Sequence, residues 1–367
     1  MNIYITDLIL SFTAIIAFTI VLSSIPTILK VARSKNLFDE PNKRTVHKVK
    51  IPTLGGLAIF IGFLFSYTFI SDWFDLNRIP FMVSSLLIIF GIGIKDDILI
   101  TAPVVKLMGQ ILAAIIIVGI GDIRITDFHG FFGLKPDYFF SLGFTILLFT
   151  FLTNGFNLID GIDGLAAIVG IVTITAFSIW FFINQQVEIP LMGAALIGSL
   201  LAFIYYNVFS KRQKIFMGDT GSLLIGFILS VVAVKFMELN ILPNNLPYQM
   251  NSAPAVAIAI LIVPIIDTLR VFFLRLAHGK SPFTADKNHI HHRMLSLGYS
   301  HLRISLTIGA ANIGFVILAY SLRNIGMLKL TGIILILGFM LASVPSFLIW
   351  LKKRQLKKEA HSHIQYD

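Results

Sequence analysis

The chain has 367 residues, of which 56% are hydrophobic and 13% are charged, and its mean hydropathy is +0.85. This composition excludes a soluble domain and indicates a protein with many membrane spans. The absence of cysteine excludes disulfides, zinc–thiolate sites and a cysteine nucleophile. We interpret the net charge of +10 as a product of membrane topology and an anionic substrate, and we expect no nucleic-acid partner.

Hydropathy predicts about eleven transmembrane helices, because a helix needs roughly 20 apolar residues to cross a bilayer. We expect an all-α polytopic integral membrane protein with a single multi-span domain over 1–351 and a basic cytoplasmic tail over 352–367. The expected spans are 6–30, 53–71, 79–94, 102–120, 137–153, 165–184, 187–208, 220–237, 253–275, 303–322 and 327–351.

Basic residues set the predicted orientation. The odd-numbered loops and the C-terminal tail carry twenty lysines and arginines, whereas the even-numbered loops carry five. Because positive charge accumulates on the cytoplasmic side, we expect the N-terminus outside and the C-terminus in the cytoplasm. Every unusual polar cluster then falls on the cytoplasmic face. A transporter would carry such residues near the midplane, so this arrangement favours an enzyme working at the membrane surface.

The first two polar clusters lie after the first and third spans. The loop FDEPNKRTVHKVKIPTLGG carries Arg44, His47 and Lys50. A topology signal alone would explain its basic residues, but it would not explain its proline and glycine residues. Asp96 and Asp97 directly follow an apolar run. Adjacent carboxylates at a membrane edge repel each other unless they are solvated, paired or bound to a cation. We interpret them as a solvated helix end, a cation site or a general base.

The third cluster, NGFNLIDGIDG, repeats an amide or acid at every third position. A step of three residues falls about 60° short of a full helical turn, so these side chains do not share one narrow face of a regular helix. The glycines between them permit a bent or broken backbone. A plain turn remains the alternative, although it would not need two amides and two acids. The residues are Asn154, Asn157, Asp160 and Asp163, with Gly155, Gly161 and Gly164 between or after them.

The fourth cluster, FMGDTGSLL, places Asp219 between Gly218 and Thr220 at an expected helix start. A simple N-cap by Asp219 or Thr220 is the structural alternative. Oxygen ligands from several loops, in a chain without cysteine, favour magnesium or manganese over zinc.

The fifth cluster, NHIHHRM, lies between the ninth and tenth spans. Its spacing is not a standard zinc pattern. Histidines beside an arginine suit phosphate binding, with a solvated basic loop as the alternative. Asp267 and Arg270 in the preceding span are three residues apart, and a simple pair between them is one interpretation. The candidate side chains of the loop are His289, His291, His292 and Arg293.

In their order and their shared face, these clusters resemble the polyprenyl-phosphate N-acetylhexosamine-1-phosphate transferase family. The resemblance covers nearly the whole chain, from DEPNKRTVHKVKIPTLGG to HIHHR. Members are integral membrane enzymes that transfer a sugar-1-phosphate from a UDP-sugar to a polyprenyl phosphate, release UMP and depend on magnesium or manganese. The resemblance implies Mg²⁺ (or Mn²⁺) as cofactor. It also implies a multi-pass location among the lipids of the bacterial inner membrane, a cytoplasmic active site and, as often in the family, a homodimer.

The histidine loop indicates a branch of this family. The peptidoglycan branch, which uses UDP-MurNAc-pentapeptide, typically has three consecutive histidines followed by Phe-Glu. The sequence HIHHRM is instead similar to the branch that starts O-antigen, enterobacterial common antigen or teichoic acid synthesis. UDP-GlcNAc and undecaprenyl phosphate are therefore the expected substrates. The alternatives within the transferase class are the pentapeptide enzyme and a transferase for another UDP-N-acetylhexosamine. The alternatives from other classes of protein are a cation-coupled transporter and a non-catalytic scaffold.

The resemblance also implies roles for individual residues. Asp219 is the expected metal ligand, with Asn157 in the metal shell. Asp96 is the candidate base that keeps the lipid phosphate deprotonated, and Asp97 would position the metal or that phosphate. Asp160 and Asp163 complete the catalytic set. The expected substrate-binding residues are Arg44, His47, Lys50, Asn154, Asn157, Gly164, Phe216, His289, His291, His292 and Arg293.

Two points stay open at this stage. Phe216 would stack on uracil if it does not simply pack in the core. Asn207 precedes Phe216 by nine residues, a longer spacing than we expect in much of the family, so its role in nucleotide binding is unsettled. A direct displacement is simpler than a covalent intermediate, because the acceptor phosphate is already a nucleophile.

Overall fold

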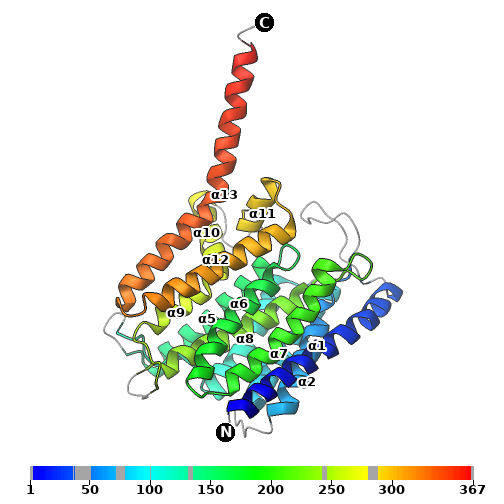
Figure 1. Ribbon diagram of the computed structural model, residues 1–367, viewed down its shortest axis with the longest axis vertical. Coiled ribbons are helices and arrows are strands. Elements are labelled where there is room, and N and C mark those ends of the chain that lie inside the picture. The colour runs from blue at the N-terminus through cyan, green and yellow to red at the C-terminus, as the bar shows by residue number, and fades with distance from the viewer. Residues whose placement is uncertain are drawn as a thin grey trace.

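The computed structural model describes residues 3–35, 37, 51–71, 79–99, 101–130, 135–241, 246–279 and 288–364. Three predicted substrate-binding residues, Arg44, His47 and Lys50, lie outside these ranges. Within them, every extended regular element is a helix (Figure 1). The helices are α1 (Ile3–Ser34), α2 (Gly55–Ser71), α3 (Ile79–Leu99), α4 (Pro103–Ile115), α5 (Tyr138–Ile159), α6 (Leu165–Ile183), α7 (Glu188–Ile204), α8 (Gly218–Leu239), α9 (Ala253–Ile260), α10 (Ile262–Ala277), α11 (Ile290–Ser296), α12 (His301–Ser321) and α13 (Met327–Ile364).

The protein is an all-helical polytopic membrane protein. Nine helical segments in the described ranges are long and apolar enough to cross a membrane, and α9 with α10 makes a tenth if the bent pair is one span. Two spans, α4 and α7, continue as π-helical turns over Ile116–Ile120 and Tyr205–Phe209. The remaining predicted span corresponds to α2, which is shorter, with 17 residues.

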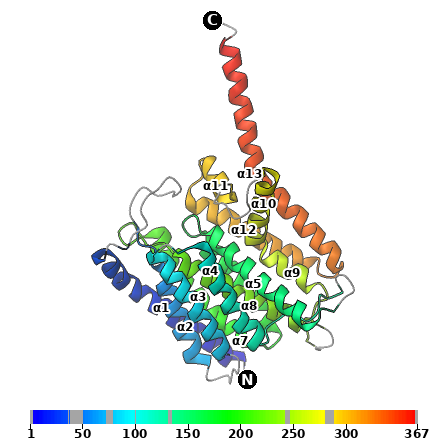
Figure 2. The ribbon, with the colours of Figure 1, turned by 180° about the vertical axis from the view of Figure 1, so that it is seen from behind.

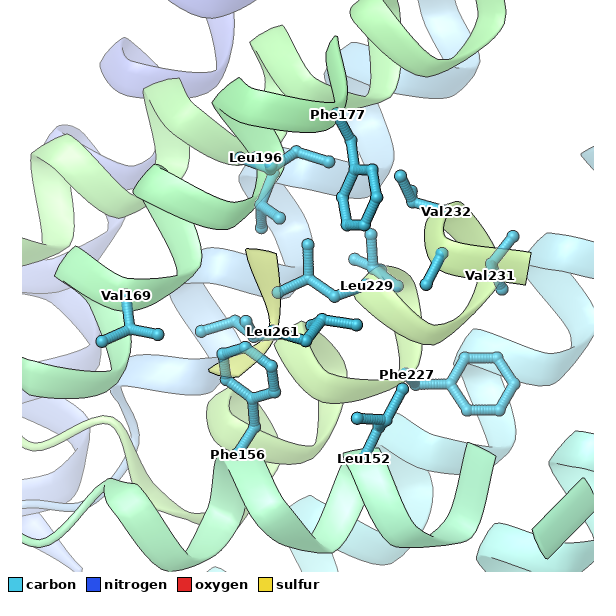
Figure 3. Packing of buried hydrophobic residues seen from close by; sticks show 14 of the residues in the cluster. Leu152, Phe156, Val169, Phe177, Leu196, Phe227, Leu229, Val231, Val232 and Leu261 are labelled. Atoms are coloured by element: carbon cyan, nitrogen blue, oxygen red, sulfur yellow. The ribbon is translucent and has the colours of Figure 1, made fainter. Parts of the chain in front are cut away.

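The most buried helix, α8, lies inside the bundle and packs on α2, α3, α5 and α6 (Figures 1 and 2). In its most apolar stretch 83% of the residues are buried, against 28% in α1. Phe227, Leu229 and Val232 of α8 belong to one buried cluster with Phe156 of α5 and Phe177 of α6 (Figure 3). Because lipid tails are as apolar as these side chains, close packing holds the helices together. The start of α8 is thereby fixed at the middle of one end of the bundle.

The predicted span over 253–275 is not straight. It breaks at Leu261, and α9 and α10 meet at a bend of 79°. The break frees the carbonyl oxygen of Ile260, which accepts hydrogen bonds from Thr173 Oγ1 (3.3 Å) and Asn312 Nδ2 (3.0 Å). Non-helical backbone at membrane depth requires such partners, since lipid supplies none. The bend sends α10 toward α5 and α13.

The last helix, α13, projects beyond the bundle on the side where α11 lies, opposite the N-terminus of α1 (Figure 1). Its helical conformation continues through Ile364. The segment over 352–367, predicted as a basic tail, is therefore an extension of the last span over its described part.

Candidate active site

At the end of the bundle near α11, the first residues of α8 are held by a carboxylate from α3. Asp97 Oδ1 accepts a hydrogen bond from Asp219 N (2.7 Å), and Oδ2 accepts from Thr220 N (3.1 Å) and Thr220 Oγ1 (2.5 Å). Gly218 opens the helix at a φ of +71°, and a Cβ there would lie 2.2 Å from Thr53 O. A carboxylate satisfies the free N–H groups and complements the helix dipole. Asp97 therefore fixes the backbone that carries Asp219.

The carboxylate of Asp219 meets an amide on one side and a lysine on the other. Its Oδ1 accepts a hydrogen bond from Asn157 Nδ2 (2.8 Å), which also lies 2.9 Å from Ser222 Oγ. Its Oδ2 forms an ion pair with Lys106 Nζ. The two predicted metal-site residues, Asn157 and Asp219, are thus in contact although they come from different helices.

Lys106, in α4, places its ammonium group among oxygen atoms from three other helices. Lys106 Nζ lies 3.6 Å from Asp96 Oδ2 and 3.4 Å from Asn157 Oδ1, in addition to its contact with Asp219. Only 16% of the lysine side chain is exposed. Our sequence analysis missed Lys106, although a lone lysine inside an apolar span is itself a signal of function. These oxygens together favour a positive charge at this point.

The donor set fits a divalent cation. Carboxylate and amide oxygens are the ligands that Mg²⁺ and Mn²⁺ prefer, and Mg²⁺ usually takes one or two carboxylates together with water and phosphate oxygens. In the part of the chain that the structure describes, no three His, Asp or Glu side chains converge closely enough to hold a metal by themselves. A cation held by Asp219 and Asn157 would therefore take its remaining ligands from water and substrate phosphates.

Asp96 stabilises the short connection between α3 and α4 by accepting hydrogen bonds from it. Its Oδ1 accepts hydrogen bonds from Thr101 N (2.7 Å) and from Thr101 Oγ1, and its Oδ2 faces Lys106. The side chain is 21% exposed. Oδ1 thus holds the turn, while Oδ2 belongs to the oxygen cluster, which we define as the side-chain oxygens of Asp96, Asn157 and Asp219 around Lys106 Nζ.

Asn154 is the predicted site residue that the structure directs elsewhere. Its Nδ2 donates to Gln110 Oε1 (2.6 Å), and Gln110 Nε2 donates back to Asn154 Oδ1 (3.3 Å). This reciprocal amide pair joins α5 to α4 about one turn deeper in the bundle than Asn157. Asn154 stabilises the helix packing beneath the site.

The chain leaves α5 through the turn at Asp160–Gly164. The helix continues past Gly155, so the break that the glycines were expected to allow occurs only at the turn. Burial raises the pKa of Asp160 well above its ordinary value, and the carboxylates of Asp97 and Asp163 raise it further.

His291 lies directly against this turn. A Cβ added at Gly161 would come within 2.2 Å of His291 Nε2, which is buried and has no hydrogen-bond partner in the described residues. Burial lowers the pKa of His291 to about 3, and the neighbouring His292 and His289 add to that effect. His291 is therefore neutral near pH 7. The ring centres of His291 and His292 are 4.3 Å apart.

The histidine loop is anchored by α10. Asp267 accepts hydrogen bonds from His289 Nδ1 (2.9 Å) and Ile290 N (2.8 Å). Arg270 Nη1 donates to Asn288 O (2.7 Å) and Nη2 donates to Ser346 Oγ (2.8 Å). The simple pair between Asp267 and Arg270 that the sequence allowed is not among these contacts of the described residues, because the bend at the start of α10 brings both under the loop. Neither was predicted to position the histidines.

Arg293 and Phe216 are two further predicted substrate-binding residues. Arg293 Nη2 donates to Asn288 Oδ1 within its own loop. Phe216 is half-buried, its N donates to Pro52 O (2.8 Å), and Gly55 N donates to its carbonyl oxygen (2.9 Å). The Phe216 ring is therefore fixed beside the start of α8, and its stacking on uracil stays a prediction.

Asp163 and Gly164 are tied to three residues outside the predicted set. Asp163 contacts Lys214 and His301. Asn207 is buried and joins two segments: its Oδ1 accepts from Gly164 N (2.7 Å), and its Nδ2 donates to Ile215 O (2.8 Å). Asn207 therefore fixes the turn after α5 against the strand-like segment before α8.

In this polytopic membrane protein, carboxylates, amides and lysines gather at one end of the helix bundle. Residues 79–237 match the family described as glycosyl transferase family 4. The chain is 32% identical over 326 residues to the probable undecaprenyl-phosphate N-acetylglucosaminyl 1-phosphate transferase of Bacillus subtilis (strain 168), covering 84% of each chain. The chain belongs to glycosyl transferase family 4.

Two further relatives are similar over most of their length. The decaprenyl-phosphate N-acetylglucosaminephosphotransferase of Mycobacterium leprae (strain TN) is 31% identical over 325 residues, 80% of each chain. The undecaprenyl-phosphate alpha-N-acetylglucosaminyl 1-phosphate transferase of Escherichia coli (strain K12) is 27% identical over 288 residues, 77% of this chain and 76% of the relative.

Proposed function

We propose that the protein transfers GlcNAc-1-phosphate from UDP-GlcNAc to undecaprenyl phosphate and releases UMP, as the first step of a cell-surface glycan. The relatives named for this activity support the proposal. The observation that carries it in the structure is the convergence of Asp96, Asn157 and Asp219 on one cationic position at the end of the bundle. Such a position suits a reaction between two phosphates.

The location of the site at the helix ends suits both substrates. A polyprenyl phosphate stays in the bilayer and a UDP-sugar stays in water, so their phosphates meet only at the interface. We propose eleven spans in the inner membrane, with the N-terminus outside and this end of the bundle in the cytoplasm, as the distribution of lysine and arginine predicts.

In the proposed reaction, an oxygen of the lipid phosphate attacks the phosphorus that bears the sugar. The bond from that phosphorus to the bridging oxygen breaks, and UMP leaves with the electron pair. Lys106 neutralises the diphosphate and aligns the two anionic partners. Asp219 and Asn157 would hold a magnesium or manganese ion, which supplies charge neutralisation when bound.

The remaining predicted residues divide by their contacts. We propose that Asp97 acts through α8, because both of its oxygens hold the backbone of that helix. Asp96 keeps one oxygen toward the oxygen cluster and is the candidate base for the lipid phosphate. Neutral His291 lies beside the turn of Asp160, where it can contact the sugar or a phosphate without carrying charge.

Replacement of Asp96 by asparagine tests its role as a base. We expect the loss relative to wild type to be largest near pH 6 and to shrink as the pH rises, because a lipid phosphate with a second pKa of about 6 is half protonated there and ionises unaided at higher pH. The measurement is UMP release between pH 6 and pH 9. A loss that is constant across this range would exclude the role as a base and point to metal or lipid positioning.

The choice of donor tests the proposed function itself. Purified protein, undecaprenyl phosphate and a panel of UDP-sugars are scored for UMP, and we expect turnover of UDP-GlcNAc and none of UDP-MurNAc-pentapeptide. Arg293→Ala should weaken use of UDP-GlcNAc strongly, and Arg293→Lys should not restore it, because lysine lacks the forked donor geometry. Equal turnover of the pentapeptide donor would reassign the substrate. Ion flux in proteoliposomes without UMP release would instead indicate a transporter.

A further inference from the structure

The carboxylate of Asp163 has one oxygen with two partners and one with none. Oδ2 accepts from Lys214 Nζ (2.7 Å) and His301 Nδ1 (2.8 Å). Oδ1 is buried and has no hydrogen-bond partner among the described residues. Leaving a buried charged oxygen without a donor costs free energy, so this atom is poised to accept a hydrogen bond from a ligand.

The first turn of α12 holds Asp163 at two points. His301 is the first residue of the helix, after the N-cap Ser300. One turn later, Ser305 Oγ donates to Asp163 O (2.8 Å). These two contacts hold the turn between α5 and α6 against α12, although more than 130 residues separate the partners in the chain.

The charges in this contact keep Asp163 ionised. Burial alone raises the pKa of Asp163, but the hydrogen bonds from His301 and Lys214 outweigh it and lower the pKa below its ordinary value. An ionised carboxylate only accepts hydrogen bonds, so the contact of 2.8 Å requires a proton on His301 Nδ1, which also lies 3.5 Å from Asp163 N. The free Oδ1 repels phosphates and selects a neutral hydrogen-bond donor, which in the nucleotide half of a UDP-sugar means a ribose hydroxyl or the imide N–H of uracil.

We propose that His301 is a positioning residue for the donor nucleotide and acts through Asp163. Its Nδ1–H fixes Oδ2, and this orients Oδ1 toward a hydroxyl or N–H of the donor. The proposal rests on the proposed function, because it requires a UDP-sugar at this end of the bundle. Lys214, which binds Asp163, also lies over the Phe216 ring, with Nζ 5.8 Å from the ring centre.

Three substitutions of His301 separate this role from general packing. In His301→Asn the amide nitrogen takes the place of Nδ1, and in His301→Gln the amide nitrogen takes the place of Nε2. His301→Ala removes both ring nitrogens. The Kd of UDP is measured by calorimetry on the full chain in nanodiscs, together with the KM values of UDP-GlcNAc and undecaprenyl phosphate. Thr307→Ala is the matched control, because Thr307 is exposed on α12 and bonds only to Arg303 O.

We expect His301→Ala and His301→Gln to raise the Kd of UDP and the KM of UDP-GlcNAc about tenfold, the factor for one hydrogen bond to a charged group. His301→Asn and Thr307→Ala should stay within about threefold of wild type, and the KM of the lipid should not change. In the Asp163→Asn background, His301→Ala should cause no further loss of UDP affinity.

Several results would overturn the proposal. These are an unchanged UDP affinity in His301→Ala, an equal rise in the KM of the lipid, and additive losses in the double variant. Wild-type protein that binds no UDP and releases no UMP would overturn the proposed function as well, so the two failures are distinguishable.

Discussion

Replacing Asp219 by asparagine is expected to reduce transfer by about 10³-fold or more while the protein remains folded in the membrane. The substitution removes the carboxylate that faces Lys106 Nζ and that we propose as the metal ligand. The amide can still be held beside Asn157, so the helix packing should survive. The measurement is UMP release by purified protein, compared with Asp7→Asn, an exposed acid in α1 that should retain wild-type activity.

Metal removal gives the same prediction a second readout. EDTA should stop the wild-type reaction, and added magnesium or manganese should restore it. Full activity in EDTA, or an Asp219→Asn variant as active as Asp7→Asn, would exclude a metal held by Asp219.

Lys106→Met is expected to lower turnover by about 10²-fold, because a cation aimed at developing charge contributes on this scale. The substitution also leaves the carboxylates of Asp96 and Asp219 facing each other without the ammonium between them. Lys30→Met, on an exposed lysine of α1, is the matched control. Unchanged kcat and donor KM in Lys106→Met would show that the lysine only stabilises the packing of α4, and a thermal melt of both variants would reveal such a loss.

The sequence predicted the helical class and the clustering of polar residues at one end of the bundle because both depend on local pattern. Apolar runs long enough to span a membrane are visible directly, and alternating spans bring every second loop to the same side. The expected helix start near Asp219 coincides with the start of α8. Asn157 and Asp219, which the sequence analysis assigned to one metal site, are in contact in the structure.

What the sequence could not predict is which side chain meets which. Asp97 was expected to position the metal or the lipid phosphate, and the sequence does not show that its oxygens hold a helix that begins 121 residues later in the chain. Asn154 and Gln110 form a reciprocal pair of amide hydrogen bonds that cannot be predicted from the spacing of either residue in the sequence. Such contacts depend on tertiary packing, so a periodic pattern of amides and acids identifies the candidates without assigning their partners.

The bend between α9 and α10 was missed for a related reason. Its apolar composition is that of a single span, and the carbonyl that the break exposes is satisfied by Thr173 and Asn312 from other helices. The same bend brings Asp267 and Arg270 under the histidine loop. The sequence analysis also missed Lys106, although a single charged residue within an apolar span indicates a functional role.

The fate of the sugar-bearing phosphate tests the central claim most directly. Purified protein in nanodiscs with undecaprenyl phosphate is given UDP-GlcNAc labelled at the phosphate next to the sugar. The account predicts that the label moves into the lipid fraction, with one UMP released for each label transferred. Label that remains in the aqueous phase as UDP, with or without sugar transfer to lipid, would contradict it.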